Sequence, residues 1–244
     1  MSSFDRVAHV YDATRSLSPP VMRKVVDGVA EFVGGSSLVD FGVGTGRLAA
    51  PLIQRGVDVV GLDIARSMIG QARDKGVARL VLAAGESAPF RGESFDYAMV
   101  VHFMHLMEEW KAVVREISRV TRKGLITLVG DPLGSLPRDT YVQLREGRGF
   151  KMAGLKMGER EMAEMVKPSV TRVLVEYREQ FDPSQLLEEY AAKLHSITWD
   201  VPDKVNAEIV DAMRPLLGRK RERERKVIMA VWDRSQLRGF DPSA

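Results

Sequence analysis

The regular alternation of strand-like and helix-like segments in the first 130 residues limits the possible folds more than any other feature of the sequence. Short runs, several of them apolar on both faces, predict strands, and segments with apolar residues at helical spacing lie between them. The predicted strands are residues 36–43, 57–64, 78–85, 95–102 and 124–131, and the predicted helices are residues 45–55, 67–75 and 108–121. Such a succession pairs strands in parallel and covers both faces of the sheet with helices. We therefore expect an α/β protein with a doubly wound, mostly parallel sheet.

The alternation ends after Asp131. Residues 132–170 hold three prolines and several glycines, and long irregular segments inside compact domains are usually functional. We therefore expect a helical cap inserted after the fifth strand, over the strand ends. The remaining predicted elements are N-terminal helices at 3–12 and 19–32, cap helices near 139–146 and 158–167, strands at 171–181 and 226–234, and helices at 184–195 and 203–217. The two added strands make seven. We expect one domain, 1–244, made of N-terminal helices (1–35), a core (36–131), the cap (132–170) and C-terminal strands and helices (171–244).

Composition excludes several classes of function. The 244 residues include no cysteine, which excludes disulfides, thiolate metal sites and a cysteine nucleophile. The net charge of +3 arises from residues 219–226 (RKRERERK), where six basic and two acidic residues give +4. Their alternating signs predict a solvated connector before the last strand, so no nucleic-acid partner is expected. The start of the chain does not resemble a signal peptide, and no window is apolar enough to span a membrane. We expect a soluble, cytoplasmic protein.

The stretch LVDFGVGTGRLA (38–49) carries the strongest functional signal. It places Gly42, Gly44 and Gly46 between a predicted strand and a predicted helix, where a ligand can contact the backbone at the carboxyl edge of the first strand. The dinucleotide fingerprint needs a further glycine where this chain has Arg47, which disfavours a nicotinamide oxidoreductase. Asp40 would repel a pyrophosphate but would suit a ligand with an ammonium or sulfonium group.

A second acidic residue completes this pattern. Asp63 ends the second predicted strand, 21 residues after Gly42. That spacing is close to the one at which an acidic residue binds the hydroxyl pair of a ribose.

With these motifs the chain resembles the class I S-adenosylmethionine-dependent methyltransferases, in particular the small-molecule branch similar to methyltransferase types 11 and 25. The similar stretches are FDRVAHVYDATRSLSPP (4–20), VDFGVGTG (39–46), GLDIARSM (61–68), GESAPFRGESFDYAMVVHFMHL (85–106), RVTRKGLITL (119–128) and the tail 177–205. The resemblance implies a Rossmann-like sheet, S-adenosyl-L-methionine as cofactor and a small-molecule methyl acceptor.

The resemblance also implies roles for individual residues. The three loop glycines would pass under the methionine and ribose portions, with Asp40 nearby, and Asp63 would bind both ribose hydroxyls. The implied adenine neighbours are Ile64 and Met68, and the implied closing residues are Tyr11 and Arg15, the latter suited to the cofactor carboxylate. One departure concerns the adenine amino group: the position that is commonly acidic is Ala84 here, so we expect Glu86 and Ser87 to replace it.

Two histidines follow the fourth predicted strand, beside the expected site of methyl transfer. A neutral imidazole can take a proton from an attacking hydroxyl or amine, so His102 is a candidate base, although the resemblance also makes it a pocket residue. His105 lacks the further ligands of a metal site, and His9 and His195 are interpreted as structural. The acceptor would lie between His102 and the cap, against an apolar wall of Leu136, Tyr141, Leu144, Phe150, Met152, Leu155 and Met157.

Two alternatives remain beside a small-molecule methyltransferase. Nucleic-acid base methyltransferases of this fold usually end the fourth strand with an acidic residue or Asn, two prolines and an aromatic residue. This chain has VVHFMH there, and DPLG (131–134) follows the fifth strand instead. A module that binds the cofactor without catalysis stays open, because catalysis by positioning requires no particular side chain. The sequence does not indicate which atom is methylated or the oligomeric state.

Overall fold

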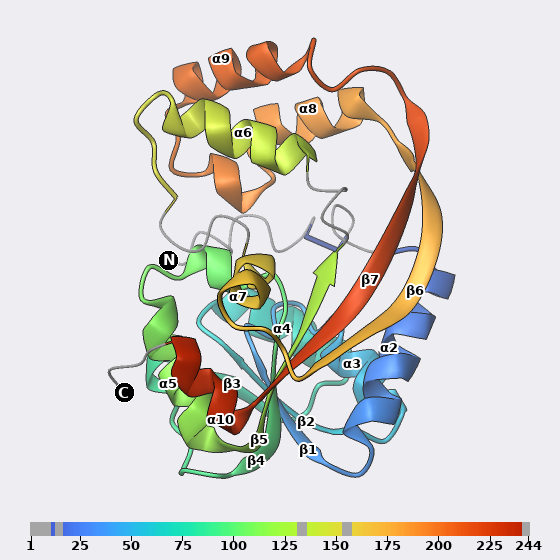
Figure 1. The fold of residues 1–244 in the computed structure, drawn as a ribbon, viewed down its shortest axis with the longest axis vertical. Coiled ribbons are helices and arrows are strands. Elements are labelled where there is room, and N and C mark those ends of the chain that lie inside the picture. Colours follow the sequence, from blue (N-terminus) through green and yellow to red (C-terminus); the bar gives the residue numbers. More distant parts are fainter. Residues whose placement is uncertain (1–10, 13–16, 131–135, 153–157, 241–244) are drawn as a thin grey trace.

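The computed structural model describes residues 11–12, 17–130, 136–152 and 158–240. Its centre is a seven-stranded sheet with the order β3-β2-β1-β4-β5-β7-β6 (Figure 1). The strands are β1 (Ser37–Phe41), β2 (Asp58–Asp63), β3 (Leu80–Leu82), β4 (Phe95–Val100), β5 (Thr121–Gly130), β6 (Val170–Phe181) and β7 (Arg221–Asp233). Pairs among β1 to β5 are parallel, and β7 is antiparallel to both of its neighbours. The chain order reverses between β1 and β4, so these strands meet at the point where α/β sheets bind ligands.

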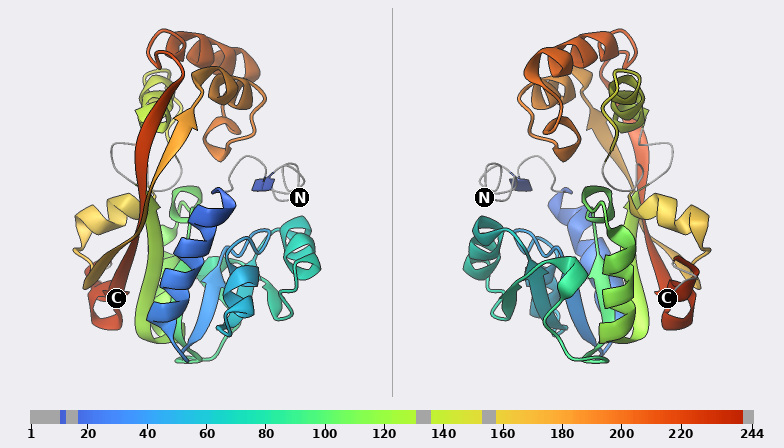
Figure 2. Two further views of the ribbon diagram at one scale, coloured as in Figure 1. Left: turned by 90° about the vertical axis from the view of Figure 1, so that its right-hand side faces the viewer. Right: turned by 90° about the vertical axis from the view of Figure 1, so that its left-hand side faces the viewer.

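Helices cover both faces of this sheet (Figures 1 and 2). One face packs against α2 (Pro19–Val33), α3 (Ala49–Gln54) and α4 (Arg66–Asp74), and the other against α5 (Trp110–Val120), α7 (Glu159–Met165) and α10 (Arg234–Leu237). Apolar residues at helical spacing explain this burial. In α2 the buried side chains are Val21, Val25, Val26, Val29 and Val33, which lie along one stripe of a helix. Each element predicted before residue 130 and after residue 17 is present, with ends that differ by up to four residues.

The strands β6 and β7 extend past the rest of the sheet as a two-stranded ribbon. Pairing of β7 with β5 ends at Val227, whereas pairing with β6 continues to Arg221. The connector expected at 219–226 is therefore wrong: residues 221–226 belong to a strand. Their alternating charges meet opposite charges on β6, as in the contacts of Arg178 with Glu224 (3.0 Å) and of Arg223 with Glu179 (2.7 Å). Cross-strand pairs of opposite charge stabilise a ribbon.

The ribbon leads to a helical layer above the carboxyl ends of the parallel strands (Figure 1). This layer, the cap, consists of α6 (Leu136–Glu146), α8 (Pro183–Ala191), the short helix η5 (Ser196–Thr198) and α9 (Asp203–Met213). It has a hydrophobic core of its own, whose fully buried members are Tyr141, Ile209 and Met213.

The cap is built from segments other than those of the expected insert at 132–170. Helix α7 lies in that range but packs beside β5 in the core, where Met162 is buried. The indole Nε1 of Trp232 donates to the carbonyl of Val166 at the end of α7, 2.7 Å away. Helices α8 and α9 from the C-terminal part take the place that α7 was expected to have.

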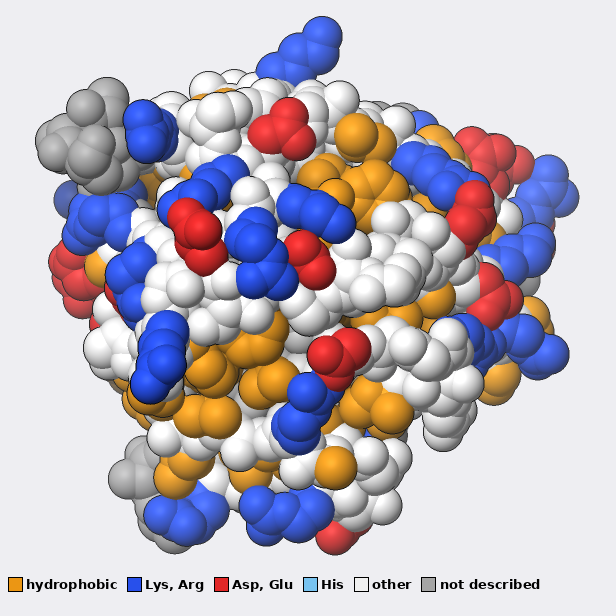
Figure 3. All heavy atoms as spheres, turned by 90° about the horizontal axis from the view of Figure 1, so that it is seen from below, with side chains coloured by type: hydrophobic (Ala, Val, Ile, Leu, Met, Phe, Trp, Pro, Cys, Tyr) orange, Lys and Arg blue, Asp and Glu red, His pale blue; other side chains and the backbone are white. Residues whose placement is uncertain are grey.

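The edge of the sheet opposite to the cap carries charges of both signs. Lys, Arg, Asp and Glu side chains are scattered there among apolar side chains (Figure 3). Several of the exposed charges pair, among them Arg55 with Asp27 (3.0 Å) and Arg234 with Glu93 (2.6 Å). In the described part of the chain, no helix combines the length and the apolar character that crossing a membrane requires.

Candidate active site between the sheet and the cap

The glycine loop after β1 requires left-handed backbone at three positions. Gly42, Gly44 and Gly46 have φ values of +76°, +55° and +73°, which residues with a Cβ rarely adopt. The amide of Gly42 donates to the carbonyl of Leu62 at 2.8 Å, which fixes the loop to β2. A Cβ on Gly46 would lie 3.1 Å from the Cα and Cβ of Ala72 in α4. Gly46 thus allows the close helix contact that the dinucleotide fingerprint assigns to a later glycine.

Asp63 lies at the end of β2 and holds this loop. One carboxylate oxygen accepts a hydrogen bond from the Gly44 amide (2.9 Å), and the other accepts from the Ala65 amide (2.8 Å). The structure therefore brings together the acidic residue and the glycines that the sequence singled out. Because a carboxylate has about four lone-pair positions, both oxygens can also accept from a ligand hydroxyl.

Asp40 lies in β1, near Asp63, and is buried, with 4% of its surface exposed. Burial, and secondly the charge of Asp63, raise the pKa of Asp40 to about 7, against the influence of Arg47. A buried carboxyl with such a pKa gains from a cationic ligand, which favours its ionised form. The residues therefore fit a ligand that presents an ammonium or sulfonium group.

The predicted adenine neighbours lie in different environments. Ile64 is 62% exposed and Leu82, at the end of β3, is 45% exposed, although both are large apolar residues. Met68 is instead buried, in a cluster with Ala65 and the side chain of Tyr11. Leu82 was missed in the sequence, although it pairs in register with Asp63 and ends the neighbouring strand.

Glu86 and Ser87 are exposed on the short helix η2 (Gly85–Ser87), which follows β3 at the same edge. Their predicted role at the adenine stays a prediction. The described N-terminal residues are tied to the same edge: Asp12 accepts from the Thr45 hydroxyl at 2.6 Å and pairs with Lys75. Arg15 lies outside the described residues.

Phe103 is a site residue that the sequence analysis missed. A Cβ on Gly42 would lie 2.4 Å from its ring, and one on Gly85 would lie 3.1 Å away. The ring therefore occupies the space that these two glycines leave open. The sequence did contain a signal for Phe103, because this residue follows β4, and β4 is the neighbour of β1 in the sheet.

Glu159 holds the turn that carries Phe103. Its buried carboxylate accepts from the amides of Phe103 (2.6 Å) and Met104 (3.1 Å). Burial raises the pKa of Glu159, and these hydrogen bonds act in the opposite direction. His102, at the start of the turn, has φ +57°, a strained conformation that concentrates at functional sites.

A cavity of about 200 Å³ lies between this turn and the cap. Both layers contribute to its walls, with the cap supplying α6, α8 and η5. The described lining residues are Tyr11, His102, His105, Leu106, Arg138, Tyr190, His195, Ser196 and Ile197. The cavity occupies the position where the acceptor was expected, between His102 and the cap.

The lining bears on two expectations. His195, which the sequence led us to interpret as structural, is also a wall residue; its Nε2 lies 2.8 Å from a carboxylate oxygen of Glu189. The expected apolar wall is wrong for its described members, since Tyr141, Leu144, Phe150 and Met152 pack in the core of the cap. The side chain of Leu136, and Leu155 and Met157, lie outside the described residues.

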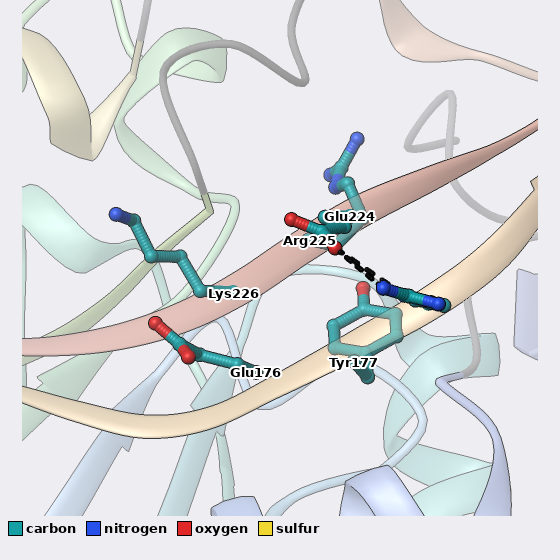
Figure 4. Close-up of a pocket in the computed structure, with 6 residues that line it drawn as sticks. Glu176, Tyr177, Glu224, Arg225 and Lys226 are labelled. Atoms are coloured by element: carbon teal, nitrogen blue, oxygen red, sulfur yellow. Dashed lines mark hydrogen bonds and ion pairs between the residues drawn. The ribbon is translucent and has the colours of Figure 1, made fainter.

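A second hollow, of about 330 Å³, lies on the ribbon and away from the glycine loop. It is lined by Glu176, Tyr177, Arg178, Glu224, Arg225 and Lys226, which come from β6 and β7 (Figure 4). Because all of these residues lie on the paired stretch of β6 and β7, the hollow is a feature of the ribbon rather than a part of the candidate site.

Comparisons with known proteins identify methyltransferases among the proteins similar to this chain. A family model described as a methyltransferase domain matches residues 39–128, from β1 to β5. An uncharacterized protein of Methanocaldococcus jannaschii is 25% identical over 173 residues, which cover 68% of this chain and 80% of that protein. Malonyl-[acyl-carrier protein] O-methyltransferase of Serratia marcescens is 33% identical over 132 residues, 52% of this chain and 50% of that protein. The chain thus spans about half the length of this named relative.

A solved structure shares the fold over more of the chain. The crystal structure of a putative methyltransferase from Bacillus halodurans C-125 aligns with a TM-score of 0.58 and 18% identity, covering 87% of this chain and 98% of that one. The matched domain, the shared fold and the glycine loop with its two acidic residues agree. Residues 39–128 therefore form a methyltransferase domain, and the chain has the fold of the class I S-adenosylmethionine-dependent methyltransferases.

Proposed function

We propose that the protein transfers a methyl group from S-adenosyl-L-methionine to a small molecule that occupies the cavity between the sheet and the cap. The observation that carries this proposal is the position of the cavity. It opens between the turn after β4 and the cap, and this turn presents Phe103 against Gly42 of the cofactor loop. An acceptor in the cavity would lie next to the loop.

The residues at the sheet edge fit the cofactor. The backbone of the loop is partly exposed at Gly42 and Gly44, Asp63 offers acceptors for the ribose hydroxyls, and Asp40 offers a buried carboxyl for a cation. Ile64 and Leu82 offer apolar surface for the adenine. S-adenosylmethionine, when bound, supplies an electrophilic methyl group on its sulfonium.

The protein contributes chiefly by alignment and by excluding water. In-line displacement needs the acceptor atom and the methyl group to be about 3 Å apart, and such positioning can supply roughly 7–11 kcal/mol of the barrier. Glu159 fixes the turn on the sheet side through two amides. On the other side, the cap closes the cavity with Tyr190, Ser196 and Ile197.

Two imidazoles are candidate bases for an acceptor that must lose a proton. Nε2 of His195 lies 2.8 Å from a carboxylate oxygen of Glu189, so this carboxylate can orient the ring. With the hydrogen on Nε2, the Nδ1 lone pair would act as the base. His102 is exposed at a strained turn. We therefore propose His195 as the base, with His102 as a pocket residue.

Calorimetric titration followed by a transfer assay tests the proposal. The purified protein is titrated with S-adenosylmethionine, S-adenosylhomocysteine and NAD, and is then incubated with methyl-labelled cofactor and a fractionated small-molecule extract. We expect micromolar binding of the first two ligands only, and label in a small-molecule fraction. Binding without transfer to any fraction would favour a non-catalytic module, and binding of NAD alone would refute the cofactor assignment.

A further inference from the structure

The turn after β4 is held by a side chain from a distant part of the sequence. Glu159, the first residue of α7, accepts at one carboxylate oxygen from the amides of Phe103 (2.6 Å) and Met104 (3.1 Å). Only 5% of the surface of Glu159 is exposed. Because a buried amide that loses its acceptor is costly, these two hydrogen bonds fix the orientation of two successive peptide groups.

The backbone of this turn requires such support. His102, the residue before Phe103, has φ +57°, a conformation that persists in a residue with a Cβ only where surrounding contacts impose it. The hydrogen bonds to the next two amides are contacts of this kind. The start of α7 also lies against the turn, since a Cβ on Gly158 would be 3.7 Å from Nδ1 of His105. The position of α7 therefore sets the path of the turn.

The order of the strands places this turn at one end of the proposed cofactor site. The carboxyl ends of β3, β2, β1 and β4 follow one another along the edge of the sheet (Figure 1). If Asp63 at the end of β2 binds the ribose and Leu82 at the end of β3 contacts the adenine, the rest of the cofactor extends past β1 toward β4. This remaining part is the sulfur with its amino acid portion.

We propose that Glu159 is a positioning residue for the amino acid end of S-adenosylmethionine, acting through the amides of Phe103 and Met104. This inference rests on the proposed function and adds to it a residue that lies outside the matched domain of residues 39–128. The ring of Phe103 transmits the position of the turn to the glycine loop, because a Cβ on Gly42 would lie 2.4 Å from this ring. A displaced turn therefore changes the surface that the amino acid end contacts.

A different role for Glu159 must be separated from this one. Its carboxylate also interacts electrostatically with Arg138 of α6, so its charge would matter most if Glu159 served only to hold the cap. The two roles depend on different properties of the side chain. Hydrogen bonds to two amides need an oxygen at the right reach, whereas attraction to a guanidinium needs the negative charge.

Two substitutions of Glu159 separate reach from charge. Glu159→Gln keeps an oxygen at the same reach without the charge, and Glu159→Asp keeps the charge but shortens the side chain by one methylene group. Calorimetry with S-adenosylhomocysteine should show about a tenfold loss of affinity in Glu159→Asp and less than about a threefold loss in Glu159→Gln, the scale of one hydrogen bond. The reverse order would overturn the proposal, because the charge would then be the property that matters.

The matched control is Glu164→Asp in the same helix. The side chain of Glu164 is 59% exposed, and its carboxylate lies 3.8 Å from the guanidinium of Arg160. The same shortening at this position should leave the affinity for S-adenosylhomocysteine unchanged. A loss equal to that of Glu159→Asp would mean that any change in α7 disturbs the site, which would also overturn the proposal.

A second ligand distinguishes positioning from a general loss of structure. The ligand 5′-methylthioadenosine keeps the adenosine and the sulfur of S-adenosylhomocysteine but lacks the amino acid portion. Its binding, measured by saturation-transfer NMR, should be the same in the wild type and in Glu159→Asp. Partial unfolding would lower the affinity for both ligands alike, so an equal loss of both would refute a role at the amino acid end.

The wild-type protein separates this inference from the proposed function. Failure of the wild type to bind S-adenosylhomocysteine would refute the proposed function itself. Binding by the wild type, with equal affinities in Glu159→Asp and Glu159→Gln, would refute only the positioning role of Glu159.

Discussion

The glycine loop with Asp63, which is the proposed cofactor wall, and the cap, which is the proposed acceptor wall, are built from contacts of different range. At the cofactor edge, each strand is followed by its own loop and helix, and Asp63 reaches the Gly44 amide 19 residues away. In the cap, α6 meets α8 and α9 from 40 to 70 residues later, as in the hydrogen bond from the Tyr141 hydroxyl to Asn206 (2.5 Å). The cofactor wall is thus encoded locally, and the acceptor wall depends on distant pairs.

The strongest test of this difference is Arg145, which is 1% exposed in the cap. Its guanidinium pairs with Asp200 (2.6 Å) and donates to the carbonyls of Phe150, Lys151 and Ile197. Arg145→Met should destabilise the protein by about 3–5 kcal/mol, because it leaves buried acceptors without a donor.

Thermal and urea unfolding measure this loss. The matched control is Arg148→Met, whose side chain is more exposed and which should cost less than about 1 kcal/mol. If the cap is held mainly by its apolar core, the two variants will instead have similar free energies of unfolding.

The second test asks which wall supplies the base. His195→Ala should lower kcat by about a hundredfold with unchanged affinity for S-adenosylhomocysteine, and His102→Ala should lower kcat much less. The measurement is the initial rate of methyl transfer to the acceptor found by screening. The reverse order would place the base on the sheet side, where the sequence alone had suggested it.

Glu189→Gln sharpens this result. The amide can still accept from Nε2 of His195 through its oxygen but carries no charge. A loss of kcat close to that of His195→Ala would show that the carboxylate charge matters. Wild-type activity in this variant would mean that Glu189 only orients the ring.

The sequence predicted that the glycine loop and Asp63 meet, because the signals for this arrangement are short in range. Apolar runs ending at Gly42 and Asp63 define strand ends, and parallel strands place their carboxyl ends at one edge. Phe103 escaped notice because its ring matters only through the space left by Gly42 and Gly85. Leu82 resembled an ordinary strand residue until its exposure was known.

The cap could not be predicted in the same way. The alternating charges of residues 221–226 are equally compatible with a solvated loop, and only their pairing with β6 makes them a strand. His195 resembled an isolated histidine because His102 and His105 lie about 90 residues earlier. The apolar residues of α6 indicate that one face of this helix is buried, but they do not indicate what it packs against. Residues that we expected in the acceptor wall therefore lie in the core of the cap.

The third test concerns the cofactor wall. Asp63→Ala should weaken binding of S-adenosylmethionine by about 1.5–3 kcal/mol, the scale of a hydrogen bond to a charged group. Calorimetry measures the change. The control is Asp58→Ala at the opposite end of β2, where the exposed carboxylate pairs with Arg79; its affinity should be that of the wild type. Equal affinity in both variants would remove Asp63 from the cofactor site.

The smallest expected effect is a pH dependence at the same wall. Burial raises the pKa of Asp40 to about 7, so below pH 7 the carboxyl is neutral in the free protein and binding of a cationic cofactor must first ionise it. Affinity for S-adenosylmethionine should therefore rise by about tenfold between pH 6 and pH 7.5, and Asp40→Asn should flatten this rise.

The stability of the folded protein changes with pH in the opposite direction. The folded-state pKa lies above the unfolded value, so ionisation of Asp40 destabilises the fold as the pH rises toward 7, and the gain in thermal stability from Asp40→Asn should grow between pH 5 and pH 7. A stability gain that does not change with pH would mean that Asp40 titrates outside this range.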